Sequence, residues 1–85
     1  MVFAILAEHE ERIAPKIEEA FTKRRVLRIG PGQWLVSFRG TSEEVLERLE
    51  LEDSDDDGVL ILTVSGYSGF TDAHIWEWLE SRWRR

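Results

Sequence analysis

An α+β domain is predicted from this sequence, because strand-like and helix-like segments alternate along one chain. The first observation is that residues 1–7 and 58–66 are apolar on both alternating faces, which is typical of strands covered on two sides. The second is a pair of strand-like runs, 24–29 and 33–38, joined by the hairpin signal Gly30-Pro31-Gly32. The third is that three segments carry apolar residues at helical spacing. The predicted order is strand, helix, strand, strand, helix, strand, helix.

The first helix follows the first strand and is expected to begin near Glu11 or Arg12. Pro15 then falls in the first turn, where a backbone amide has no partner within the helix. The apolar residues at helical spacing are Ile13, Ile17, Ala20 and Phe21.

The second strand of the hairpin places Trp34, Val36 and Phe38 on one face, and Gly40 ends it. The next helix opens with Thr41, followed three residues later by Glu44, which is the spacing of a capping box. Its expected apolar stripe is Val45, Leu46 and Leu49.

The last strand leads through the loop "GYSGF" into a helix capped by Thr71 or Asp72. We expect Phe70, close to the start of this helix, to belong to the core. Tyr67 is expected to be exposed.

The final helix concentrates three of the four tryptophans. At about 100° per residue, an arc of about 100° holds Ile75, Trp76, Leu79 and Trp83. Trp76 and Trp83 are therefore predicted to pack on the sheet of their own chain. Trp78 lies outside this arc beside Arg82, which is typical of an interface anchor. The alternative is a half-buried ring at the edge of the domain, with Arg82 stacked over it.

Six of the seven elements match the ferredoxin-like pattern βαββαβ, and the C-terminal helix is an addition. The expected strand order is 4-1-3-2 in a four-stranded antiparallel sheet, with two helices on one face. Because the first and last strands are apolar on both faces, the added helix is expected to cover the other face. Residues 1–85 are predicted to form a single domain.

Cysteine is absent, which excludes disulfides and thiolate metal sites. The apolar start has no basic region or cleavage site and is too short to span a bilayer. We therefore expect a cytoplasmic protein with no membrane association.

Charge is unevenly placed around a net value of −6. Residues 41–58 hold nine acids and one base, whereas 23–28 hold four bases and no acid. The four bases, with Trp34 across the hairpin, form a candidate single-strand nucleic-acid platform: Lys23, Arg24, Arg25 and Arg28. The overall negative charge argues against that platform.

The stretch "DSDDDG", which begins with Asp53–Asp57, matches the first half of an EF-hand calcium loop. The closing glutamate is replaced by Val64, which favours a solvated turn. His9 and His74 have no second histidine at ligand spacing. No metal, cofactor or catalytic residue is predicted.

The layout resembles small ferredoxin-like proteins that share the fold of the CRISPR-associated adaptation subunit and its toxin-like relatives. The similar stretches are the apolar first strand, "GQWLVSF", "TSEEVLERL" and "GVLILTVSG". The resemblance implies homodimers formed through sheet edges and the segment after the fourth strand, here Gly66 to Phe70 and the final helix. Nuclease members carry a metal-binding aspartate after the first strand, where this chain has Glu8. Metal-dependent nuclease activity is therefore not expected.

The function predicted from the sequence is that of a non-catalytic, acidic protein-interaction module that forms a homodimer. Its contact residues would be Trp78, Arg82 and Tyr67. The alternative is a nuclease-like or degenerate nucleic-acid-binding protein that uses the four bases of 23–28. A structural domain of a larger assembly is a third interpretation.

Overall fold

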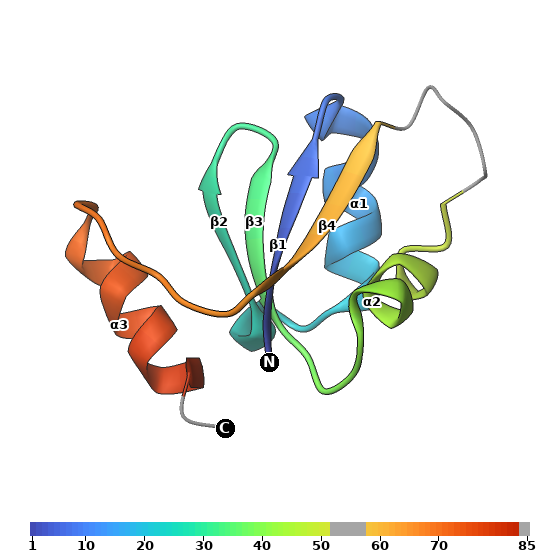
Figure 1. Ribbon diagram of the computed structural model, residues 1–85. Coiled ribbons are helices and arrows are strands. Elements are labelled where there is room, and N and C mark those ends of the chain that lie inside the picture. The colour runs from blue at the N-terminus through green and yellow to red at the C-terminus, as the bar shows by residue number, and fades with distance from the viewer. Residues whose placement is uncertain (52–57, 84–85) are drawn as a thin grey trace.

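The computed structural model describes residues 1–51 and 58–83 and contains four strands and three α-helices (Figure 1). Along the chain these are β1 (Val2–Ala7), α1 (Glu10–Ala20), β2 (Val26–Gly30), β3 (Gln33–Ser37), α2 (Ser42–Arg48), β4 (Val59–Val64) and α3 (Ala73–Trp83). A 3₁₀ turn, η1 (Lys23–Arg25), precedes β2. The strands form one antiparallel sheet in the order β2-β3-β1-β4, which confirms the predicted ferredoxin-like topology.

The pairing register assigns each strand residue to one of two faces. Phe3 lies opposite Val36 of β3, and Ile5 lies opposite both Trp34 and Ile61. These residues share one face, which we call the covered face. Alternation along the strands turns the remaining residues to the second face: Val2, Ala4, Leu6, Leu35, Leu60, Leu62 and Val64.

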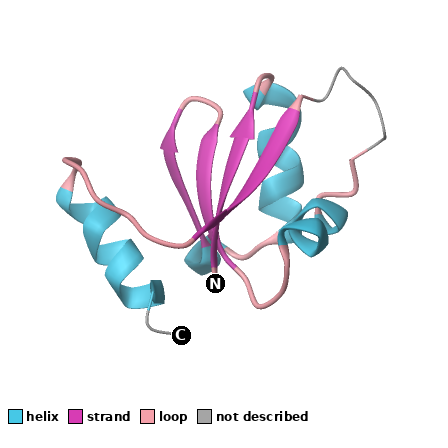
Figure 2. Ribbon diagram, viewed as in Figure 1, coloured by secondary structure: helices cyan, strands magenta, loops and turns pink. Residues whose placement is uncertain are grey.

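Helices α1 and α2 lie on the covered face, and α3 lies on the opposite side of the sheet (Figure 2). The core under α1 and α2 is closed, because Ile13, Ile17 and Val45 are fully buried against the strands. Phe38 completes it through edge contacts with Phe3 and Phe21. Each such side chain contributes roughly 1.5–3 kcal/mol to folding.

Local sequence signals set two of the connections. The Thr41 hydroxyl accepts a hydrogen bond from the Glu44 amide at 3.2 Å, and the Glu44 carboxylate accepts one from the Thr41 amide at 3.0 Å. The capping box is therefore confirmed. Gly32 has a φ of 68°, and an added Cβ would lie 2.4 Å from the Ala7 carbonyl oxygen. The hairpin therefore closes against the end of β1 only with glycine at this position.

The second face is only partly covered. Leu79 of α3 packs against Val2 and Leu35, and Trp78 and Trp83 lie at the margin of this cluster. The rest of the face is open: Leu6, Leu60 and Leu62 are 37%, 54% and 44% exposed. The prediction that α3 covers this face is therefore confirmed only for the part that holds Val2 and Leu35.

Three details of the predicted core are wrong. Trp78, and not Trp76, packs with Trp83 against the cluster of Val2, Leu35 and Leu79, because α3 turns the side that bears Trp78 toward the sheet. Phe70 is fully exposed in the loop before α3, because that loop passes beyond the sheet. Leu46 is also exposed, since α2 is only seven residues long and buries Val45 and, at its end, Leu49.

Candidate functional site

Trp78 and Arg82 lie together on α3. The Arg82 guanidinium carbon lies 5.0 Å from the centre of the Trp78 ring, which is a cation–π contact. Trp78 is half-buried beside Leu79, and its Nε1 is buried without a hydrogen-bond partner among the described residues. This is the geometry of a half-buried ring with an arginine stacked over it, which was the alternative to an interface anchor. The predicted role of the pair in an interface is not tested by its position.

Tyr67 belongs to a different cluster. Its ring contacts Trp83 with centroids 4.9 Å apart and Trp76 with centroids 5.5 Å apart. Tyr67 and Trp83 line a shallow cleft together with Glu77 and Glu80. Tyr67 remains about one-third exposed, as expected. Trp76 and Trp83 thus hold the loop that follows β4 against α3.

The four bases predicted for nucleic-acid binding do not act as one group. Lys23, Arg24 and Arg25 are exposed in the turn η1. Arg28 lies within β2, where its Nε donates to Glu10 Oε1 at 2.5 Å. This hydrogen bond, together with one from the Gly32 backbone, lowers the pKa of Glu10 below its ordinary value, and it raises the pKa of Arg28. Arg28 is therefore engaged in holding the start of α1 to the sheet.

A different set of arginines does converge. Arg24 and Arg25 from η1, Arg39 from the β3–α2 connection and Arg82 from α3 line one cleft of about 1130 Å³. Arg82 also donates through Nη1 to Ser81 Oγ and through Nη2 to the carbonyl oxygen of Arg24, which ties α3 to η1. We call this surface the arginine cleft. The local sequence does not predict this cleft, because Arg39 and Arg82 are far from 23–28 in the chain.

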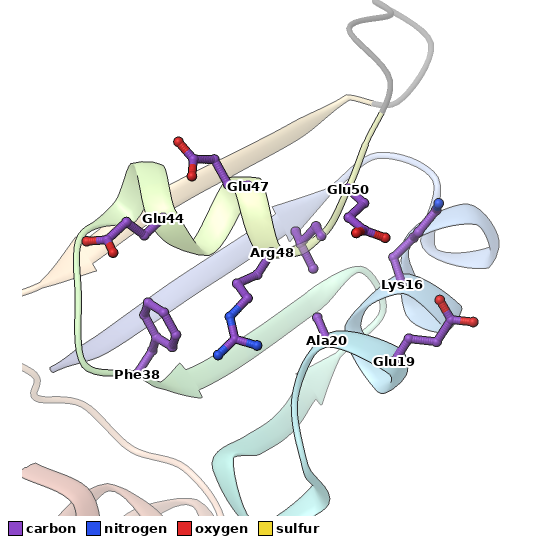
Figure 3. A pocket seen from close by; sticks show the side chains of 9 residues that line it. Lys16, Glu19, Ala20, Phe38, Glu44, Glu47, Arg48 and Glu50 are labelled. Carbon is purple, nitrogen blue, oxygen red and sulfur yellow. The ribbon is translucent and has the colours of Figure 1, made fainter.

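A second groove lies between α1 and α2, and Figure 3 shows the side chains that line it. The Arg48 guanidinium covers the ring of Phe38, 5.3 Å from its centre. Charges of both signs alternate around this groove, whose acids are Glu19, Glu44, Glu47 and Glu50 and whose bases are Lys16 and Arg48. A groove of mixed charge, with one glutamate engaged in capping α2, favours no particular ligand.

Among residues 1–51 and 58–83, no group of three or more His, Cys, Asp or Glu side chains is arranged to hold a metal ion. The half calcium loop at Asp53–Asp57 lies outside the described residues. Glu8 is exposed after β1, and its amide donates to the Gly58 carbonyl oxygen at 2.9 Å. Its backbone therefore joins the end of β1 to the start of β4.

The open half of the second face lies along the edge strand β4. Leu60 pairs with Leu6, and Leu62 pairs with Ala4, so the exposed leucines form one continuous patch. We call Leu6, Leu60 and Leu62 the β4 patch. Strand β4 pairs only with β1 within the described sheet, so its outer edge presents free backbone groups.

The α-helices that the structure describes do not exceed 11 residues, and none of them is long and apolar enough to cross a membrane. Comparison with protein-family models, curated proteins and solved structures finds no match for this chain.

Proposed function

We propose that this protein is a non-catalytic interaction module that forms a homodimer through β4. The observation that carries the proposal is the β4 patch beside a free strand edge. Leu60 and Leu62 are about half exposed and adjacent, whereas equivalent leucines and valines at the other end of the face are buried under α3. Contiguous exposed apolar surface of this kind marks interaction sites.

Strand β4 is suited to pairing with a second copy of itself. Its sequence, VLILTV, contains no charged residue and no proline, and these residues commonly protect an edge strand from pairing. A two-fold axis through Ile61 would pair the strands antiparallel and set Leu60 opposite Leu62 of the second copy. The same leucines would then be buried as cross-strand pairs.

The interface predicted from the sequence remains part of this proposal. Tyr67 lies three residues after the end of β4, so it would lie close to a partner that pairs with that strand. Trp78 and Arg82 lie on α3, where they would contribute only if the partner also reached this helix. The predicted resemblance to dimeric ferredoxin-like proteins is consistent with the use of a sheet edge and of the segment after β4.

The proposal is tested by replacing Leu62 with glutamate and measuring mass by size exclusion with light scattering over a concentration series. A charge in the β4 patch should raise the dissociation constant of the dimer by at least about tenfold, because it would be buried without a partner. The matched control is Leu46→Glu on α2, since Leu46 is 45% exposed and Leu62 is 44% exposed.

The two variants carry the same change in charge at equal exposure. Loss of the dimer in Leu62→Glu alone supports the proposal. A monomeric native protein at all concentrations, or equal weakening in both variants, would contradict it.

A further inference from the structure

The arginine cleft is assembled by three segments that are distant in sequence. The turn η1 supplies Arg24 and Arg25, the segment after β3 supplies Arg39, and the last turn of α3 supplies Arg82. Figure 1 shows why they meet, since η1, the end of β3 and the end of α3 lie at the same end of the molecule as the start of β1. The hydrogen bond from Arg82 to the Arg24 carbonyl oxygen fixes this arrangement.

The cleft is electropositive in a chain that has 17 acids and 11 bases. No carboxylate is among the described residues that line it. The side chains of Arg24, Arg25 and Arg39 make no ion pair or hydrogen bond with another described residue. Because acids are abundant elsewhere, three guanidinium groups around one cleft that have no acidic partner among residues 1–51 and 58–83 indicate a site for an external anion.

We propose that the arginine cleft binds a short acidic segment of a partner protein. Guanidinium groups donate in a planar fork that matches a carboxylate in two parallel hydrogen bonds. The hydroxyls of Thr22 and Ser37 line the same cleft and add neutral donors beside the arginines. Charges on several sides of the cleft suit a segment with successive acids, because each carboxylate would meet a different arginine.

Among the described residues that line it, the cleft offers no open aromatic face on which a base can stack, which is the second component of a nucleic-acid platform. Phe38 is its one aromatic residue among the described lining. Arg48 covers the ring of Phe38 at 5.3 Å, and the rings of Phe3 and Phe21 pack against it edge to face. The net charge of −6 also opposes a long polyanion more strongly than a short peptide.

The test is a titration of the full chain with a capped hexa-aspartate peptide carrying a fluorescent label, followed by anisotropy. The neutral hexa-asparagine peptide has nearly the same shape and serves as the ligand control. We expect binding of the acidic peptide alone, weakened when ionic strength rises from about 0.02 to about 0.2 M.

Variants assign the binding to the cleft. Arg25→Gln and Arg39→Gln should each weaken binding of hexa-aspartate roughly fivefold or more, because each removes a charge-assisted hydrogen bond. Lys23→Gln is the matched control, since Lys23 lies in the same turn as Arg25 and carries the same charge but does not line the cleft. Its effect should stay below about twofold.

Three results would overturn the inference. The first is equal binding of the two peptides, and the second is equal weakening in Lys23→Gln and Arg39→Gln. The third is tighter binding of a labelled oligothymidylate of equal charge, which would assign the cleft to nucleic acid.

A variant with Asp53, Asp55, Asp56 and Asp57 replaced by asparagine identifies the source of the acidic segment. Tighter binding of hexa-aspartate by this variant that persists at about 0.2 M ionic strength, where long-range repulsion is screened, would mean that the chain's own acidic run competes for the cleft, which would overturn a foreign partner. Unchanged binding of hexa-aspartate supports a foreign partner. Because this experiment reads peptide binding and not mass, its failure is distinguishable from failure of the β4 dimer.

Discussion

Strands β2 and β4 both lie at an edge of the sheet, but they differ in features that hinder pairing with another chain. Strand β2 carries a charge, Arg28, and its pairing with β3 is irregular between Arg28 and Gly30. Strand β4 is uncharged and regularly paired with β1 over all six residues. Charges and irregularities at an edge protect a sheet from unwanted pairing. Strand β2 therefore carries two features that hinder edge pairing, and β4 carries neither of them.

The largest change in stability is expected from loosening α3. This helix packs beside β2 and buries Leu79 against Val2 and Leu35. Leu79→Ala should lower the free energy of unfolding by about 2–4 kcal/mol, through lost burial and the cavity that remains. Urea unfolding followed by tryptophan fluorescence measures this loss. Loosening α3 should also expose the second face beside β2 and β3. The Leu79→Ala variant should then associate through that surface as well, so adding Leu62→Glu should no longer make it monomeric.

Leu46→Ala provides the reference for Leu79→Ala, since Leu46 is exposed and its truncation should stay within about 0.5 kcal/mol. If the two variants lost the same stability, α3 would not be part of the folded unit.

A smaller effect is expected at the hairpin that sets the register of β2. Gly32→Ala should cost about 1–3 kcal/mol of unfolding free energy, because Gly32 has a positive φ and no room for a Cβ beside the Ala7 carbonyl. Gly66→Ala is the matched control, since an added Cβ there meets no atom within 4 Å. Thermal unfolding of the two variants should separate them clearly, and equal midpoints would show that the hairpin is not tightly closed.

The smallest change in stability is expected from the ion pair between Arg28 of β2 and Glu10. Glu10 has its pKa lowered from the ordinary value of 4.5 by the hydrogen bond from Arg28, so its contribution to stability is complete above that value. The contribution is lost as the pH falls through the lower pKa of the folded state. Arg28 is exposed and Glu10 is partly exposed, so solvent screens the pair and the effect is small.

Comparison of wild type with Glu10→Gln, by unfolding in urea at a series of acidic pH values, measures this contribution. The difference between the two proteins should shrink as the pH falls below 4.5. A difference that stays constant with pH would mean that Glu10 does not hold β2 through its charge.

The fold follows from signals that are local in the sequence. The doubly apolar runs gave β1 and β4, Thr41 and Glu44 gave the start of α2, and the ferredoxin-like order then fixed the sheet. These predictions succeed because each rests on periodicity or capping within a few residues.

The surfaces were harder to predict. The incomplete cover by α3 depends on where that helix lies, and its helical periodicity does not contain this information. The arginine cleft depends on the ends of three elements that meet at one end of the sheet. Phe70 shows the same limit, since its apolar side chain predicts burial while the path of the loop leaves it exposed.

The most direct test of the account is hydrogen exchange of the backbone amides, measured by mass spectrometry on dilute and concentrated protein. We predict that a peptide covering Val59–Val64 gains protection when the protein is concentrated, while the protection of a peptide covering Val26–Gly30 does not change. Protection gained at β2 and not at β4, or at neither strand while the mass doubles, would contradict an interface built on the β4 edge.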